Sequence, residues 1–169
     1  MNRQRPPILF ITLAAGLFAL SGIAHSQGRH GDVMVTVTTD KVIALPAGGS
    51  AIEEGLGVNE TVATTAARGQ TGFAQTSTRL LGFSSELRRW TDVQLAAEER
   101  VERHQVLPRL ILVQTNRQLY GFQEGRGHWT NESLGARETV TQLHGHGHVA
   151  VVITTERALA FSSFTGGLF

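Results

Sequence analysis

Three histidines alternate with two glycines in the segment His144-Gly145-His146-Gly147-His148. Because side chains alternate along an extended chain, all three imidazoles would lie on one side and within reach of one metal ion. Three histidine ligands suit zinc, which would serve a metal-dependent hydrolase. The neighbouring glycines favour a competing interpretation, a solvated loop. A divalent metal at His144, His146 and His148 is therefore one hypothesis, and no other cofactor is expected.

Repeated carboxylates are a second candidate for chemistry. Glu60, Glu99 and Glu138 are spaced 39 residues apart, and paired carboxylates carry out glycoside hydrolysis. Recurrence at one repeat position instead favours a role in a turn of each unit. No serine lies in a Gly-x-Ser-x-Gly elbow, and Gly55-Leu56-Gly57 lacks the rest of a phosphate-binding motif. We therefore name no catalytic residue.

Residues 1–26 are predicted to be a secretory signal peptide. Arg3 and Arg5 supply its positive start, and a mainly apolar run covers residues 8–24 before a predicted cleavage after Ser26. An uncleaved membrane anchor is the alternative. We expect a secreted or periplasmic protein, with no membrane insertion after cleavage.

Composition narrows the class of protein further. Apolar residues make up 41% and charged residues 17% of the chain, which is typical of a folded domain rather than a disordered one. The absence of cysteine excludes disulfides and thiolate metal sites, and in an exported chain it indicates a bacterial source. Lys and Arg total 15 against 14 Asp and Glu, so loss of Arg3 and Arg5 leaves 13 against 14. This balance disfavours a nucleic-acid partner.

An internal repeat covers the rest of the chain. Its four copies occupy residues 38–45, 76–83, 115–122 and 154–161, and their leading threonines are 38, 39 and 39 residues apart. One column of the repeat holds only small residues: Ala44, Gly82, Gly121 and Ala160. A second column, seven positions after each copy, holds Ile52, Trp90, Trp129 and Leu168. We expect the small column to permit close approach of neighbouring units and the tryptophans to be packed.

Each unit is predicted to hold four short strands, since runs of Val, Ile, Thr and aromatic residues alternate with turn residues. The segments Leu110–Val113 and Val149–Ile153 are apolar on both faces. Such strands are expected where neighbouring sheets cover both sides.

The pattern resembles that of β-propeller repeat proteins as a class, which build each blade from four antiparallel strands in about 40 residues. The resemblance implies an all-β fold with three full blades and a partial fourth, after the signal peptide and a short segment, 27–33. The predicted blades cover about 34–70, 71–108, 109–147 and 148–169. No single propeller family matches, because the marks of WD40 repeats and of sialidase-like blades are absent. Stacked sheets or a sandwich with duplicated hairpins are the alternatives.

A propeller would gather alternate turns on one face. These turns carry the candidate ligand-binding residues Arg68, Arg88, Arg109, Arg126 and His128. The same face is expected to hold His104 and the three-histidine segment, with Glu86 and Glu124 as its nearby acids. Since the opposite face mixes both signs of charge, we expect the first face to bind an anionic partner, such as an acidic glycan or an acidic protein patch.

The sequence therefore favours an exported, non-enzymatic binding or assembly scaffold whose ligand is unknown. One alternative is a metal-dependent hydrolase that uses His144, His146 and His148, and another is an inactive, truncated propeller fragment. An incomplete fourth blade would expose unpaired strand edges, which a twofold homodimer would cover. A self-contained propeller with four blade positions is the alternative to that dimer.

Overall fold

The computed structural model describes residues 31–165, and its fold is all-β apart from one short 3-10 helix, η1 (Glu124–Arg126). The predicted signal peptide, residues 1–26, and Leu168 lie outside the described residues. The strands form four antiparallel sheets, which we number sheet 1 to sheet 4 along the chain.

Sheet 1 and sheet 4 have three strands each, and the two sheets between them have four each. Sheet 1 has the order β1 (Val33–Val37), β2 (Lys41–Pro46), β3 (Ile52–Gly55). Sheet 2 has the order β4 (Val62–Arg68), β5 (Thr71–Thr76), β6 (Arg79–Ser84), β7 (Arg89–Gln94). Sheet 3 has the order β8 (Val101–Leu107), β9 (Leu110–Thr115), β10 (Gln118–Gln123), β11 (His128–Ser133). Sheet 4 has the order β12 (Val140–His146), β13 (Val149–Thr154), β14 (Ala158–Ser162).

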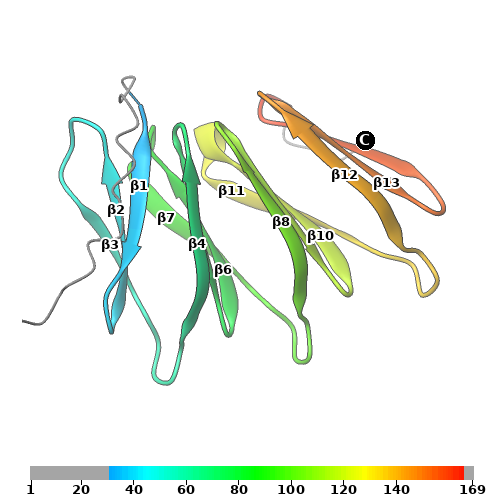
Figure 1. Cartoon of the computed structure of the whole chain (residues 1–169), viewed down its shortest axis with the longest axis horizontal. Coiled ribbons are helices and arrows are strands. Elements are labelled where there is room, and N and C mark those ends of the chain that lie inside the picture. The colour runs from blue at the N-terminus through cyan, green and yellow to red at the C-terminus, as the bar shows by residue number, and fades with distance from the viewer. Residues whose placement is uncertain (1–30, 166–169) are drawn as a thin grey trace, which may run out of the picture.

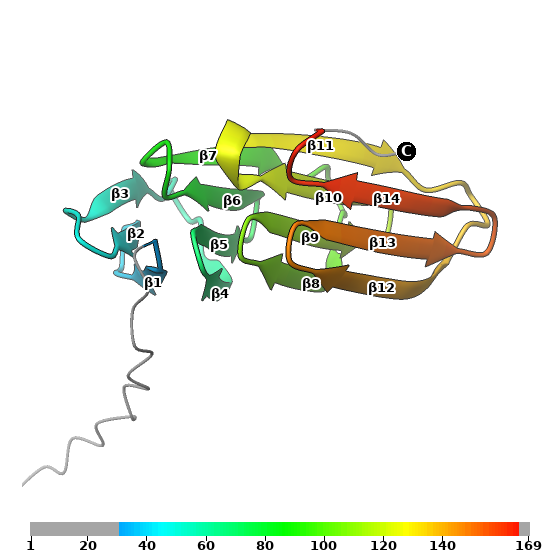
Figure 2. The ribbon, with the colours of Figure 1, turned by 90° about the horizontal axis from the view of Figure 1, so that it is seen from above.

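The four sheets lie in a row, with sheet 1 at one end and sheet 4 at the other (Figure 1). Seen from above, β1, β4, β8 and β12 follow one another along one edge of the row, and β3, β7 and β11 along the other (Figure 2). The described strands therefore make an open row of stacked sheets rather than a closed ring.

The row has two ends with different connections. Long crossovers, residues 56–61, 95–100 and 134–139, lie at the lower end in Figure 1, which we call the crossover end. Six of the described hairpins lie at the upper end, which we call the turn end: residues 47–51, 69–70, 85–88, 108–109, 124–127 and 147–148. The other four described hairpins, residues 38–40, 77–78, 116–117 and 155–157, share the crossover end.

The sheets differ from the predicted blades in which strands they combine. The last strand of each sequence unit opens the following sheet, so β4 pairs with β5 rather than with β3. Gly69 and Gln70 join β4 to β5 in a tight hairpin, with Gly69 at φ +55°. Short hairpin loops make the strands they join pair with each other, whereas segment 56–61 carries the chain to a new sheet. The expected three full blades and a partial fourth are thus two four-stranded sheets between two three-stranded sheets.

Position in the row decides which strand faces are buried. Every residue of β9 is buried, because sheets 2 and 4 cover its two faces. The equally apolar β13 alternates between exposed and buried residues, since sheet 4 has a described neighbour on one side only. The prediction of two covered faces is therefore confirmed for Leu110–Val113 and contradicted for Val149–Ile153.

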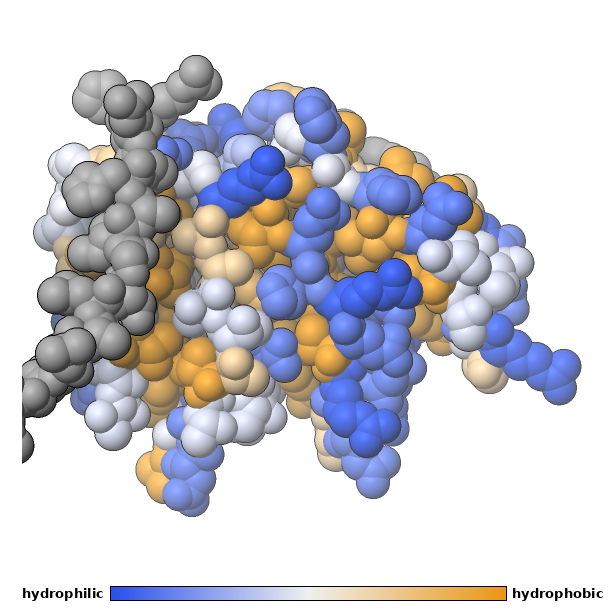
Figure 3. All heavy atoms as spheres, in the orientation of Figure 1, coloured by the Kyte–Doolittle hydropathy of each residue, from blue (hydrophilic) through white to orange (hydrophobic). Residues whose placement is uncertain are grey.

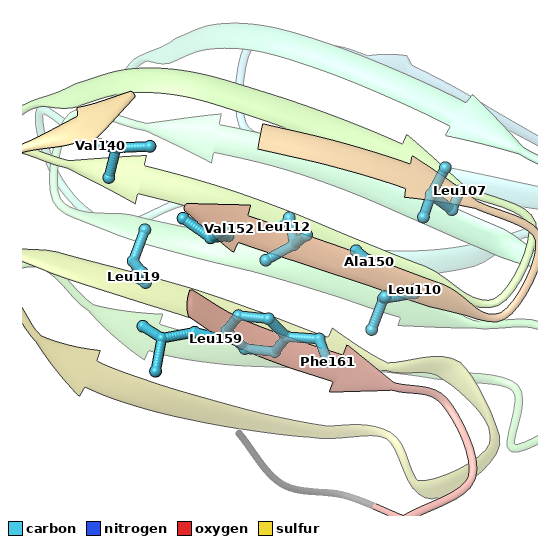
Figure 4. Close-up of a cluster of buried hydrophobic side chains, with 9 residues drawn as sticks. All are labelled: Leu107, Leu110, Leu112, Leu119, Val140, Ala150, Val152, Leu159 and Phe161. Atoms are coloured by element: carbon cyan, nitrogen blue, oxygen red, sulfur yellow. The ribbon is translucent and has the colours of Figure 1, made fainter. Parts of the chain in front are cut away.

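Three apolar clusters separate successive sheets. The cluster between sheets 3 and 4 sets Leu110 and Leu112 of β9 against Val152, Leu159 and Phe161 of sheet 4 (Figure 4). Figure 3 shows apolar atoms reaching the surface between bands of hydrophilic ones on the face seen in Figure 1. The stack therefore has its cores between its sheets rather than at one common centre.

Glycines in the third strand of a sheet receive aromatic rings from the next sheet. A Cβ added to Gly82 would lie 2.6 Å from the ring of Phe122, and one added to Gly121 would lie 2.4 Å from the ring of Phe161. Both positions therefore need the smallest residue, as expected where another chain segment approaches closely. The predicted role of the small column is confirmed at these two positions.

The tryptophans of sheets 2 and 3 each form a hydrogen bond to the preceding sheet. Trp90 and Trp129 are 9% and 7% exposed, and their indole N–H groups donate to the carbonyls of Ile52 (3.1 Å) and Thr91 (3.0 Å). Ile52 thus occupies the position of Thr91 and does not belong to the tryptophan column. The one-residue difference arises because Ile52 pairs with Ala44, whereas Trp90 pairs with Phe83.

Candidate functional site

The repeated glutamates serve the crossovers in which they stand. The carboxylates of Glu60, Glu99 and Glu138 each accept a hydrogen bond from the main-chain N–H three residues earlier. The donors are Gly57 (2.6 Å), Ala96 (2.9 Å) and Gly135 (2.9 Å). The prediction that these carboxylates support a turn of their own unit is confirmed.

Two arginines join neighbouring sheets at the crossover end. Arg79 donates from Nε to Glu60 (2.8 Å) and from Nη1 to Glu54 of the preceding sheet (2.9 Å). Arg157 repeats this arrangement two interfaces further on, between sheets 3 and 4, with its partners Glu138 (2.9 Å) and Glu132 (2.7 Å). The guanidinium fork suits such contacts, because it binds several oxygens in one plane.

Sheet 3 holds its carboxylate with hydroxyl groups instead. Gln118 stands at the position of Arg79, and the Tyr120 hydroxyl donates to Glu99 at 3.0 Å. Glu99 also accepts a hydrogen bond from the Thr115 hydroxyl at 2.6 Å. Burial, and then the bond to Glu99, raise the pKa of Tyr120 above its usual value. The buried carboxylate of Glu99 is therefore hydrogen-bonded to groups of the fold itself.

The two arginine-bound carboxylates stay ionised in acid. Hydrogen bonds from Arg157 and from the Gly135 N–H lower the pKa of Glu138 from 4.5 to about 2. Burial opposes ionisation of Glu60, but the bonds from Arg79 and Gly57 outweigh it, so its pKa is also lowered to about 2. A carboxyl whose pKa is depressed by folding stabilises the folded state above its unfolded-state pKa.

Stability is therefore expected to be full above about pH 4.5 and to fall progressively as the pH drops toward 2. Melting temperatures measured from pH 7 to pH 2 test this. Arg157→Gln should flatten the fall, whereas Arg137→Gln, at an exposed position of the same end, should leave it unchanged. A melting temperature that stays constant down to pH 2 would contradict this role of the carboxylates.

The three histidines of the predicted metal site do not share one site. His144 and His146 are exposed on β12, beside a hollow of about 420 Å³ that Gln105 and Val149 also line. His148 lies in the following turn, where its Nδ1 is 3.1 Å from the Ser163 hydroxyl. Within residues 31–165, no group of three or more His, Asp or Glu side chains is arranged to hold a metal ion.

His104 also departs from its expected place. It lies in the middle of β8 rather than at the turn end, with its ring centroid 5.1 Å from that of Phe73. Burial lowers the pKa of His104. Its packing against an aromatic ring of sheet 2 makes it part of the contact between sheets.

Arg109 lies at the turn end but is engaged by carboxylates. Its guanidinium donates to Glu124 at 3.0 Å and also to Glu86. Glu124 is fully buried and further accepts bonds from the Ser84 hydroxyl (3.2 Å) and the Glu86 N–H (2.8 Å). Because removing one partner of a buried ion pair leaves an uncompensated charge, Arg109 is a structural link between the turns of sheets 2 and 3.

The other candidate cations of the turn end are exposed. Within the described part of the chain, Arg68, Arg88 and Arg126 form no ion pair with a carboxylate. Arg88 donates to the Ser50 hydroxyl (3.1 Å) and Arg126 to the carbonyl of Phe164 (3.2 Å), which are neutral acceptors. His128, the remaining candidate, is exposed at the start of β11.

Sequence reasoning missed one cation of this surface. Arg89 is exposed at the start of β7, and its guanidinium donates to the carbonyl of Arg126 at 3.4 Å. Its place directly before the packed Trp90 pointed to a strand interior. The alternation of side chains along a strand could have predicted its exposure. Since Trp90 is buried, the residue directly before it points to the opposite, exposed face.

The fold and this surface define an all-β protein whose described residues form four stacked antiparallel sheets, with exposed arginines at the turn end. No protein-family model matches the chain, and no curated protein matches it. No helix within residues 31–165 is long and apolar enough to cross a membrane.

Several solved structures resemble the chain at low identity. Human WBSCR16 matches at 11% identity with a TM-score of 0.40, over 83% of this chain and 49% of that one. The N-terminal domain of Nup159 matches at 12% with a TM-score of 0.41, over 81% and 40%. The extracellular domain of the putative one component system BT4673 from B. thetaiotaomicron matches at 10% with a TM-score of 0.36, over 80% and 23%. The chain thus spans less than half the length of each of these structures, and none of the TM-scores reaches 0.5.

Proposed function

We propose that this chain is an exported, non-enzymatic binding module whose turn end holds an anionic partner. The observation that carries the proposal is a contrast between the two ends of the row. At the crossover end, Lys41, Arg79, Arg117 and Arg157 each pair with a carboxylate, and the exposed Arg100 and Arg137 are the exceptions among the described residues of its crossovers. At the turn end, Arg109 pairs with Glu86 and Glu124. The other four arginines of this end pair with no carboxylate among the described residues: Arg68, Arg88, Arg89 and Arg126.

The positions of these cations suit an extended polyanion. Arg88 reaches Ser50, which follows β2 in sheet 1. Arg126 reaches Phe164, which follows β14 in sheet 4. The guanidinium groups therefore follow the length of the row rather than converge on one point. An acidic glycan presents charges at intervals along a chain, and arginine keeps its charge at any physiological pH.

Export is the second part of the proposal. It is supported by the positive start and apolar run of residues 1–26. Acidic glycans are abundant outside cells, so a secreted or periplasmic location would bring the turn end into contact with such a partner.

Binding to an immobilised sulfated polysaccharide at neutral pH tests the proposal. The triple variant Arg68→Gln, Arg88→Gln, Arg126→Gln should elute at a lower salt concentration than the parent. Each exposed ion pair contributes about 0.2–1 kcal/mol, so loss of three should weaken binding by roughly 3-fold to 100-fold.

The matched control is the triple variant Arg100→Gln, Arg117→Gln, Arg137→Gln, which removes three exposed arginines from the crossover end. Both variants have the same net charge, so a nonspecific charge effect would weaken both equally. Equal loss in the two variants, or no retention of the parent, would overturn the proposed binding surface.

A further inference from the structure

We propose that a second copy of this chain packs the outer face of its sheet 1 against the outer face of sheet 4. The first observation is the composition of the sheet 4 face. Val149, Val151 and Ile153 of β13 point away from sheet 3 and are 52%, 39% and 36% exposed. The solvated face of an antiparallel sheet usually carries polar residues at such positions, whereas these three residues are all apolar and β-branched.

The same positions one sheet earlier form a buried contact. Leu110 and Leu112 of β9 correspond to Val149 and Val151 in the repeat, and both are buried under sheet 4. Gly121 of β10 corresponds to Ala160 of β14, and Gly121 receives the ring of Phe161. Sheet 4 therefore presents the pattern of an intersheet contact, with Ala160 at the place where the next sheet would insert a side chain.

The outer face of sheet 1 carries the complementary half of that contact. Leu45 of β2 stands at the repeat position of Phe83, Phe122 and Phe161, the residues that point toward the preceding sheet. Met34 and Ile43 share this face with Leu45, as the register of β1 and β2 shows, and Met34 is 58% exposed. If the repeat continues from one copy to the next, Leu45 of the second copy lies over Ala160 of the first.

The two faces can meet without burying an unpaired charge. Lys41 and Glu53 at the rim of the sheet 1 face pair with each other at 2.7 Å. On the sheet 4 face, β13 is flanked by His144 and His146 of β12 and by Ala158 and Ala160 of β14. The residues that pair with Val149, Val151 and Ile153 include no Lys, Arg, Asp or Glu. Such a face and an internal ion pair impose little of the desolvation penalty that isolated charges would add.

A twofold axis would cover the outer faces of sheets 1 and 4 in both copies. Sheet 1 of each copy would cover sheet 4 of the other, which gives a ring of eight sheets. Eight lies within the usual range of four to eight blades. Without such closure, the same head-to-tail contact would build open chains.

Thiol crosslinking tests the predicted pairing, because the chain has no cysteine of its own. Leu45→Cys and Ala160→Cys place one thiol each on opposite end faces of the row. An equimolar mixture of the two single variants should give a crosslinked dimer with a short bifunctional thiol reagent, whereas neither variant alone should. The control is Leu45→Cys mixed with Ala63→Cys, which carries its thiol on an exposed position of β4.

Two results would overturn the proposal. Crosslinking of Ala160→Cys with itself would show that two sheet 4 faces meet. A mixture that stays uncrosslinked, together with a monomeric mass of the parent at micromolar concentration, would show that no second copy covers these faces.

A solution variant provides an independent measurement. Val151→Asp should convert the dimer to a monomer, because it places a charge in the centre of the apolar contact. Light scattering measures the resulting change in mass. Val151 is exposed within one copy, so the variant should keep the far-ultraviolet circular dichroism of the parent. A variant that folds and remains a dimer would contradict the contact.

Discussion

Replacing Trp129 with alanine is expected to lower the free energy of unfolding by about 3–5 kcal/mol, the usual cost of truncating a buried tryptophan. The side chain is 7% exposed and packs against Phe122, with ring centroids 5.2 Å apart. Its indole also donates to the carbonyl of Thr91 in sheet 2. The variant would therefore lose a core side chain and one of the contacts that join two sheets. Chemical denaturation followed by circular dichroism measures the effect.

The neighbouring residue supplies the control for this experiment. His128→Ala removes an exposed side chain from the same strand, and surface changes of this kind usually alter stability by less than about 0.5 kcal/mol. Trp129→Phe should fall between the two, since it keeps an aromatic ring but loses the hydrogen bond. An unchanged unfolding curve for Trp129→Ala would instead assign the indole to a ligand surface.

The second large effect is expected at Gly121. A Cβ atom added to Gly121 would lie 2.4 Å from ring carbons of Phe161. Gly121→Val would therefore force a branched side chain into the space that this ring occupies. Overpacking of a filled core costs about 1–3 kcal/mol, occasionally more. Because the ring belongs to sheet 4, the variant should loosen the packing of that sheet on sheet 3. Loss of stability is again measured by denaturation.

A double-mutant cycle isolates the contact between these two residues. The combination of Gly121→Val with Phe161→Ala should cost less than the sum of the two single changes, because the smaller residue makes room for valine. Ala63→Val, at an exposed position of β4, controls for the added volume and should be close to neutral. Strict additivity in the cycle would show that the ring does not set the size limit at Gly121.

The strands and their packing were readable from the sequence, but the division into sheets was not. A repeat fixes the spacing of equivalent residues and leaves open which strand begins a unit. The structure begins each complete sheet with the strand after a crossover, so β4 belongs with β5. Connection length carried the missing information, because Gly69 and Gln70 are too few to lead the chain to another sheet. The same limit applies to Ile52, whose shift of one residue follows from the pairing of β2 with β3.

The candidate site was predictable as a surface and not as a set of contacts. Arg68 stands at the hairpin between β4 and β5, and Arg88 and Arg126 stand in the β6–β7 and β10–β11 connections. All three arginines lie at the turn end because these connections are at the same end of their sheets. Arg109 belongs to the same end, yet it is held by the buried carboxylate of Glu124. Nothing in the local sequence distinguishes a buried glutamate in a turn from an exposed one. That difference depends on the neighbouring sheet, which covers Glu124 completely.

The open row gives the single chain a one-dimensional character. Each sheet packs only on its neighbours, so stability approaches a sum of sheet and interface contributions, as in solenoid proteins. Sheets 1 and 4 have one described interface each, whereas sheets 2 and 3 have two. In a single copy, fraying should therefore begin at the two ends, and the amide hydrogens of β5, β6, β9 and β10 should exchange most slowly. The same arrangement would let a whole unit be inserted into or deleted from the middle of the row while every remaining interface keeps its form.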